Sequence, residues 1–204
     1  MKTVFVNPEK CIGCRHCEIA CALEHSQSKD IFTAFFESPI SQPRIHVERG
    51  VGFATFPNRC RHCDPAPCMQ VCPTGALYRD EETGSVLVNY DKCIGCAMCA
   101  MVCPFDVITF TEVWNVNFAH EVNAKCDHCI ERQREGREPA CVEACKTGAL
   151  EFGDVNDIIR SSREDFTLRV TTALKGEEAP SEIPANIAAF RSIMETVSKV
   201  GPLD

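Results

Sequence analysis

Residues 60–77 read CRHCDPAPCMQVCPTGAL, a stretch that carries four cysteines. Parts of it return elsewhere: CPTGAL at 72–77 is matched by CKTGAL at 145–150, and KCIGC occurs at 10–14 and again at 92–96. Such internal repeats indicate similar cysteine-bearing units. The sixteen cysteines of the 204-residue chain form four quartets with none left over: Cys11, Cys14, Cys17 and Cys21; Cys60, Cys63, Cys68 and Cys72; Cys93, Cys96, Cys99 and Cys103; Cys126, Cys129, Cys141 and Cys145.

The spacing within the quartets indicates what the thiols hold. The first and third quartets follow C-x2-C-x2-C-x3-C, the spacing of bacterial ferredoxins, and Pro104 follows the third as it does in that pattern. A short loop with a cysteine at every third residue can wrap three corners of one cubane. Zinc sites instead use paired C-x2-C knuckles, often with histidine, and disulfides need an oxidising compartment. The quartets therefore predict iron–sulfur clusters, with zinc and disulfides as the alternatives.

The fourth cysteine of each quartet follows the third by four residues, about one helical turn. It therefore points away from the cluster of its own loop and reaches a neighbouring one, as in two-cluster ferredoxins. Sixteen thiolates, at four for each cubane, predict four fully ligated [4Fe–4S] clusters. Because no iron is left open to a substrate, we expect a chain that transfers electrons and is not itself an enzyme.

Charge and targeting signals narrow the function classes. The net charge is −8, with no basic stripe, which argues against nucleic acid as a partner. No Gly-rich phosphate loop is present, so neither flavin nor nicotinamide is expected. Too few residues precede Cys11 to contain the apolar region of a signal peptide. Neither a twin-arginine signal nor an apolar run of transmembrane length occurs. We therefore expect a cytoplasmic protein, with export bound to a signal-bearing partner as the alternative.

Short elements are predicted around the quartets, with no long helix before residue 154. Strands are predicted at residues 3–6, 44–48, 86–89, 107–110 and 150–152, and the polar stretch around Thr83 and Gly84 predicts a hairpin. Apolar residues at helical spacing predict one helix in the cysteine-free tail: Ile187, Phe190, Met194 and Val197. The expected fold class is α+β.

Several features stand outside the repeating units. The apolar run at residues 31–36 is expected to form local core, with a docking surface as the alternative. Residues 111–125 carry Trp114. The tail either packs on its own domain or grips a partner, and the sequence favours neither. His16, His62 and His128 each precede a cysteine of a quartet, and we expect them to be partly exposed and to shape their loops. Proton-coupled tuning of a cluster is the alternative role.

On these motifs the chain resembles the four-cluster ferredoxin subunits of dimethyl sulfoxide reductase, formate dehydrogenase and formate hydrogenlyase, and the electron-transfer protein of carbon monoxide dehydrogenase. The resemblance rests on residues 60–77, on KCDHC at 125–129 and on PACVEAC at 139–145, and it covers residues 3–153. Ala22 and Lys146 stand where the ferredoxin pattern has proline after the last cysteine. Proline is not a ligand, so these two departures leave cluster binding intact.

The resemblance implies two ferredoxin-like 2[4Fe–4S] modules, one inserted within the other. Residues 1–59 and 111–153 would form the outer module, residues 60–110 the inner module, and residues 154–204 a C-terminal helical tail. In the family the two outer quartets exchange fourth ligands, and so do the two inner ones. Carried over, four sites follow: site 1, Cys11, Cys14, Cys17 and Cys145; site 2, Cys126, Cys129, Cys141 and Cys21; site 3, Cys93, Cys96, Cys99 and Cys72; site 4, Cys60, Cys63, Cys68 and Cys103.

The expected function is electron transfer between a catalytic oxidoreductase subunit and an acceptor. The small size and the absence of an anchor most resemble members that serve carbon monoxide dehydrogenase, hydrogenase, formate dehydrogenase or tungsten and molybdenum enzymes. A free, diffusible polyferredoxin is the main alternative. A redox or oxygen sensor is a further alternative, against which the lack of a DNA-binding motif argues.

Overall fold

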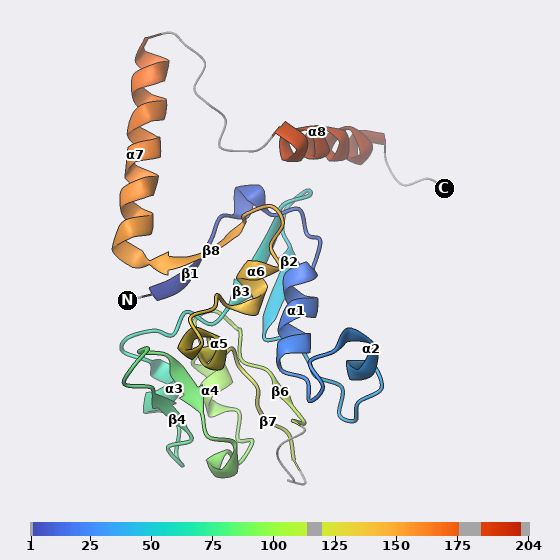
Figure 1. The fold of residues 1–204 in the computed structure, drawn as a ribbon, viewed down its shortest axis with the longest axis vertical. Helices are drawn as coiled ribbons and strands as arrows, with labels where there is room; N and C mark the ends of the chain where they lie inside the picture. Colours follow the sequence, from blue (N-terminus) through green and yellow to red (C-terminus); the bar gives the residue numbers. More distant parts are fainter. Residues whose placement is uncertain (1, 114–119, 176–184, 201–204) are drawn as a thin grey trace.

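The computed structural model describes residues 2–113, 120–175 and 185–200, so Trp114 lies outside the described residues. Figure 1 shows a body that contains all the cysteine segments, with two long C-terminal helices beside and above it. The body is built from short helices and two-stranded sheets. None of the helices in these ranges combines the length and apolar character that crossing a bilayer requires.

The described residues form four antiparallel strand pairs. Strand β1 runs against β8, which brings the beginning of the cysteine-rich region next to its end, with Val4 opposite Phe152. The β4–β5 pair confirms the predicted hairpin, and the Asp80 carboxylate closes its turn by accepting hydrogen bonds from Thr83. The pairs are β1 (Lys2–Val6) with β8 (Leu150–Asp154), β2 (Ile45–Arg49) with β3 (Thr55–Arg59), β4 (Leu77–Arg79) with β5 (Val86–Val88), and β6 (Phe110–Thr111) with β7 (Val122–Asn123).

Four of the five predicted strands are confirmed within two residues. The exception is 107–110, where only Phe110 joins a strand, although Val107 and Ile108 are buried as a strand assignment would require. Their burial explains the apolar run: these residues fill the core from a loop. Strands β3 and β7 were not predicted.

The helices before residue 154 are short, as predicted: α1 (His16–Glu24), α2 (Ile31–Ala34), α3 (Pro67–Gln70), α4 (Met98–Met101), α5 (Ile130–Arg134) and α6 (Ala140–Glu143), with 3-10 turns η1 (Pro8–Lys10) and η2 (Tyr90–Lys92). The repeated KCIGC motif explains how α1 and α4 begin. Gly13 and Gly95 adopt φ of +70° and +66°, and each helix starts after a further left-handed residue. A Cβ on Gly95 would lie 2.9 Å from the Glu121 carbonyl oxygen, so only glycine fits there.

Two small apolar cores hold the body together. One combines Val4, Ile45, Val47, Val142 and Leu150 with cysteines of the first and fourth quartets. The other combines Ala66, Leu77, Val86 and Ile108 with cysteines of the second and third quartets. Because cysteines form part of both cores, whatever the thiols bind is also part of what stabilises the fold.

The tail contains two helices, α7 (Val155–Leu174) and α8 (Ala185–Val200). Helix α8 confirms the predicted helix, and it contacts the body through buried Ile187 and a 3.1 Å hydrogen bond from Arg191 Nη2 to the Pro8 carbonyl oxygen. Helix α7 lies within the residues expected to form a helical tail, but no periodicity predicted it as a separate helix. It begins at the N-cap Asp154, has no buried residue and extends away from the body (Figure 1).

The apolar run at residues 31–36 is exposed, so the expectation that it forms local core was wrong. Phe32 and Phe36 keep 79% and 84% of their surface exposed. Polar contacts hold this loop instead: the Asp30 carboxylate caps α2, and the Glu37 carboxylate accepts hydrogen bonds from two backbone amides. A four-residue helix presents too little surface to reach the body and cover these rings.

Candidate metal centres

Two small cavities are each lined by four cysteines drawn from two quartets. The first brings Cys72 to the first three cysteines of the third quartet, Cys93, Cys96 and Cys99. The second brings Cys103 to the first three cysteines of the second quartet, Cys60, Cys63 and Cys68. These groups are the members of sites 3 and 4. The remaining lining of both cavities is mostly apolar.

The cysteines of the first and fourth quartets also lie near one another. Burial raises the pKa of Cys21 well above its usual value, and the neighbouring Cys126, Cys141 and Cys129 raise it further. These are the four members of site 2. Burial likewise raises the pKa of Cys17 to about 12, with contributions from Cys141, Cys11 and Cys14. Cys145 packs against the same apolar core as Cys17.

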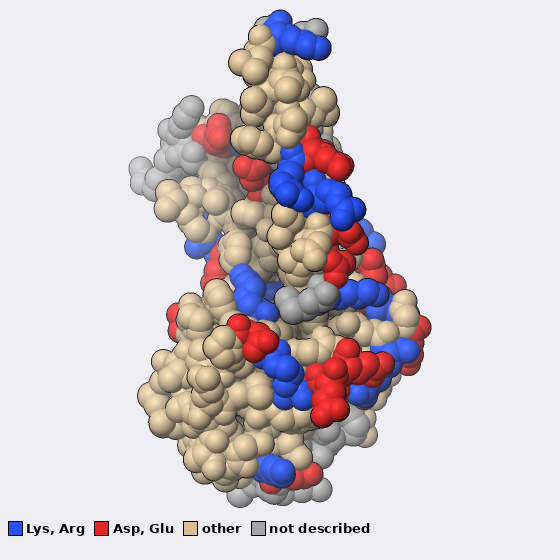
Figure 2. Space-filling model, turned by 90° about the vertical axis from the view of Figure 1, so that its left-hand side faces the viewer, with Lys and Arg blue, Asp and Glu red and all other residues tan. Residues whose placement is uncertain are grey.

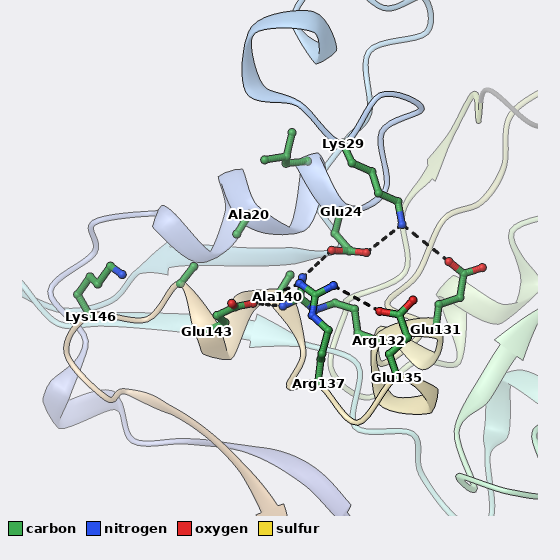
Figure 3. A pocket seen from close by; sticks show the side chains of 12 residues that line it. Ala20, Glu24, Lys29, Glu131, Arg132, Glu135, Arg137, Ala140, Glu143 and Lys146 are labelled. Carbon is green, nitrogen blue, oxygen red and sulfur yellow. Dashed lines mark hydrogen bonds and ion pairs between the residues drawn. The ribbon is translucent and has the colours of Figure 1, made fainter.

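Ion pairs fix α1 against α5 and α6, and thereby position cysteines of the first and fourth quartets. The buried Arg132 guanidinium lies 2.8 Å from the Glu24 carboxylate on α1 and also pairs with Glu143 on α6 (Figure 3). Lys29 joins Glu24 to Glu131 from the other side. Since Cys21 lies on α1 and Cys141 on α6, this network holds the two sulfur-bearing helices in register.

Backbone conformation turns amide groups toward the thiols. In the second and fourth quartets the residue before the second cysteine is left-handed, with φ of +50° at His62 and +65° at His128. The His62 amide lies 3.4 Å from Cys60 Sγ, and the His128 amide lies 3.4 Å from Cys126 Sγ. Concave arrangements of backbone N–H groups of this kind hold anions, including iron–sulfur clusters.

Side chains and one further amide also donate to sulfur. Buried Asn123 donates from Nδ2 to Cys99 Sγ at 3.1 Å, and Thr55 Oγ1 donates to Cys11 Sγ at 3.2 Å. The amide of Arg44 lies 3.2 Å from Cys21 Sγ. Hydrogen bonds to ligand sulfur tune the reduction potential of a cluster. These donors were not predicted, because they come from strands and loops distant in sequence from the cysteines they contact.

Asp127 organises a charged network beside site 2. Its carboxylate lies 3.0 Å from His25 Nε2 and 3.0 Å from the buried Arg44 guanidinium. Burial alone raises the pKa of Asp127, but His25 and Arg44 hold it well below its usual range. Donor atoms of His25, Asp127 and Cys129 lie within 4.8 Å of one another. This group shares Cys129 with site 2, so it belongs to that site.

Two of the three quartet histidines are buried, contrary to expectation. His16 is exposed, but His62 and His128 retain only 8% and 3% of their surface. Their rings stack with centroids 4.7 Å apart and planes 20° apart. The Val86 amide donates to His62 Nδ1 at 3.0 Å, and Ser85 Oγ lies 3.0 Å from His128 Nδ1. The expectation failed because the two loops face each other across the interior.

The same region contains a buried charge for which the described residues offer no acceptor. Arg59 is 1% exposed, and none of its three guanidinium nitrogens has a hydrogen-bond partner within the described part of the chain. The Nε2 atoms of His62 and His128 likewise have none there. An unpaired buried charge costs several kcal/mol. A [4Fe–4S] cluster with four thiolates carries about −2 and offers sulfur acceptors, so these donors and the cysteine sets fit iron–sulfur clusters.

Comparison with known proteins agrees with this chemistry. A family model described as a 4Fe-4S dicluster domain matches residues 51–155. Electron transport protein HydN of Escherichia coli is 39% identical over 170 residues, which cover 79% of this chain and 93% of HydN. An NrfC homologue of Haemophilus influenzae is 39% identical over 159 residues, covering 72% and 62%. A tetrathionate reductase subunit of Salmonella typhimurium is 33% identical over 156 residues, covering 76% and 58%.

The chain therefore belongs to the 4Fe-4S dicluster domain family. It is an iron–sulfur electron-transfer protein, similar to HydN, to NrfC and to this subunit of tetrathionate reductase. The predicted resemblance to ferredoxin-type electron-transfer subunits and the choice of iron–sulfur over zinc are confirmed.

Proposed function

We propose that the chain holds four [4Fe–4S] clusters at sites 1–4 and is the electron-transfer subunit of an oxidoreductase complex. The observation that carries the proposal is the pair of cavities in which three cysteines of one quartet meet the fourth cysteine of another. A bound cluster takes up and releases one electron. The chain supplies the ligands, the apolar surroundings and the hydrogen bonds to sulfur, and it performs no chemistry on the substrate.

The two apolar cores support the two proposed modules, because each core belongs to one module. The core built on Val4, Ile45 and Leu150 draws only on residues assigned to the outer module, 1–59 and 111–153. The core built on Leu77, Val86 and Ile108 draws only on residues assigned to the inner module, 60–110. The β1–β8 pair closes the outer module by joining its two ends. A C-terminal tail, residues 154–204, completes the proposed organisation.

Cysteine exposure supports an order for the sites. Cys14 of site 1 and Cys96 of site 3 are exposed, whereas Cys21 and Cys129 of site 2 and Cys60 of site 4 are buried. Sites 2 and 4 adjoin each other, because the rings of His62 and His128 stack and Lys125, next to Cys126, lies 3.8 Å from Cys60 Sγ. We therefore propose the order 1–2–4–3, with electrons entering or leaving where Cys14 and Cys96 reach the surface.

The surface around Cys96 suits a protein partner. Ile94, Met98 and Met101 are exposed beside it. Figure 2 shows few charged side chains over the lower part of the face that it draws, at the height where α3, α4 and β4 lie in Figure 1. Clustered exposed apolar residues mark interaction surfaces. We propose that a catalytic subunit docks here, with carbon monoxide dehydrogenase, hydrogenase, formate dehydrogenase and tungsten or molybdenum enzymes as candidates, and that the complex is cytoplasmic.

The experiment is anaerobic affinity purification of the full chain from its host, followed by mass spectrometry and metal analysis. A stoichiometric large subunit that carries molybdenum, tungsten or nickel is the expected result. Met101→Asp should reduce recovery of that subunit without changing the iron content of the chain. Leu174→Asp, at an apolar position on α7 that is also strongly exposed, is the matched control and should leave recovery of that subunit unchanged. Recovery of the brown chain alone would contradict the subunit assignment and favour a diffusible shuttle.

A further inference from the structure

The first and second quartets share a four-residue motif, and the structure places its histidine differently in each. Residues 14–17 and residues 60–63 both read CRHC. His16 of the first motif is exposed, whereas His62 of the second keeps only 8% of its surface exposed. His62 also lines the cavity that brings the cysteines of site 4 together. The same motif therefore puts one histidine in solvent and the other against a candidate metal centre.

Two residues at the start of strand β5 hold the ring of His62 in place. The Val86 amide donates a hydrogen bond to His62 Nδ1 at 3.0 Å. The Ser85 hydroxyl lies 3.0 Å from Nδ1 of His128, whose ring stacks on that of His62. Ser85 and Val86 are each only 1% exposed. A hydrogen bond at one nitrogen and a stacked ring on one face leave the His62 side chain little freedom to turn.

The contact with Val86 also fixes which nitrogen of His62 carries the proton. A backbone N–H can only donate, so Nδ1 accepts this bond and holds no proton of its own. The ring is therefore neutral, and its one proton is on Nε2. That atom is buried, and no acceptor for it lies among the described residues. Leaving a buried N–H without an acceptor costs the free energy of its desolvation.

A cluster in site 4 would supply the acceptor that the Nε2 proton needs. Apart from His62 and Arg61, the cavity is lined by apolar residues and cysteines, among them buried Val107 and Ile108. The sulfurs of a [4Fe–4S] cluster and its thiolates accept hydrogen bonds, and such bonds help to set the reduction potential. In an apolar interior the electrostatic part of a hydrogen bond is stronger than in water. The ring and the cysteine set therefore suit the same occupant.

We propose that His62 donates a hydrogen bond from Nε2 to a sulfur of the cluster in site 4 and thereby raises the reduction potential of that cluster. The proposal rests on the four-site function above. Reduction adds one negative charge to the cluster, so its sulfurs accept a hydrogen bond more strongly in the reduced form. Because a neutral ring supplies this bond, His62 takes up no proton with the electron.

The test is an EPR-monitored redox titration of the purified, anaerobic full chain, in which Cys68→Ser first assigns the site 4 signal. His62→Asn should lower the potential of that signal. Asparagine suits the left-handed φ of +50° at this position, and its side-chain oxygen can accept from Val86 in place of Nδ1. It leaves no N–H in the place of Nε2.

His62→Gln should restore part of the lost potential, because its side-chain amide puts an N–H near the place of Nε2. His16→Asn, in the identical CRHC motif, is the matched control. It should leave the potential of the site 4 signal unchanged, since the ring of His16 is exposed. An unchanged site 4 potential in His62→Asn would overturn the inference.

Pulsed EPR on chain containing ¹⁵N-histidine tests the hydrogen bond itself, and it gives the answer if His62→Asn does not accumulate. The site 4 signal should show a ¹⁵N coupling in the unsubstituted chain and in His16→Asn, but not in His62→Gln. Its absence from the unsubstituted chain, or its persistence in His62→Gln, would contradict the proposal while leaving the four-site function intact. Absence of any signal that responds to Cys68→Ser would instead overturn the four-site function.

Discussion

The ammonium nitrogen of Lys125 lies 3.8 Å from the sulfur of Cys60, across a separation of 65 residues. The contact joins the second quartet to the fourth in a dry interior, where a charge acts much more strongly than at the surface. It gives the two proposed modules a shared electrostatic environment and not only a packing interface.

Replacing Lys125 by methionine should therefore lower the potential of the site 4 signal. The methionine occupies a similar volume but removes the positive charge that favours the reduced form. Redox titration of the signal assigned with Cys68→Ser measures the change. Lys125→Arg, which keeps the charge, should leave the potential close to that of the unsubstituted chain. An unchanged potential in Lys125→Met would show that the lysine only satisfies the two carbonyl groups.

The exchange of fourth ligands makes Cys72 a member of site 3, although it closes the second quartet in sequence. Cys72→Ser should perturb the same EPR signal as Cys96→Ser, because both residues line the same cavity. Cys68→Ser should perturb a different signal, since Cys68 lines the other cavity. The ligand exchange would be refuted by a Cys72→Ser spectrum that changes only where the Cys68→Ser spectrum changes.

Asp127→Asn should destabilise the chain by about 3 kcal/mol, because it leaves the buried guanidinium of Arg44 without its carboxylate. The denaturant concentration at which cluster absorbance is lost measures the effect. Asp157→Asn removes one carboxylate of an exposed ion pair with Arg160 on α7 and should cost less than about 0.5 kcal/mol. Equal effects of the two substitutions would contradict a structural role for Asp127.

The exposed phenylalanines of α2 and the residues after it should contribute little to stability. Phe36→Ser should change the free energy of unfolding by less than about 0.5 kcal/mol, as exposed positions usually do. Ile45→Ala, at a position that is 1% exposed in the outer core, should cost about 2–5 kcal/mol. The same denaturation assay compares the two. A large cost for Phe36→Ser would mean that residues 31–36 pack into the core after all.

The sequence predicted an element correctly where residues close together in the chain determine its structure. The turn around Thr83 predicted the β4–β5 hairpin, because Asp80 closes it within a few residues. The spacing of Ile187 and Phe190 predicted α8. Helix α7 lacked such a signal: Phe166 and Leu168 on it are exposed, so its apolar residues mark no buried stripe. The N-cap Asp154 was the one available indication of where it begins.

Part of the site was likewise predictable from the sequence and part was not. The cysteine spacing predicted iron–sulfur chemistry, because the ligand residues and their spacing can be read directly from the sequence. The burial of Arg59 and Lys125 was not predictable from composition, because such residues are ordinarily solvated. The charges of Arg59 and Lys125 come together because the RCRHC motif at 59–63 and the KCDHC motif at 125–129 face each other in the fold. The similarity of these two motifs was the sequence feature that could have indicated this arrangement.

The most direct measurement of the central claim is the iron and acid-labile sulfide content of the anaerobically purified chain, with Mössbauer spectroscopy to identify the cluster type. Sixteen cysteines in four occupied sites predict about sixteen irons and about sixteen sulfides for each chain, all in [4Fe–4S] clusters. About eight of each, the content of two clusters, would contradict the assignment of four sites.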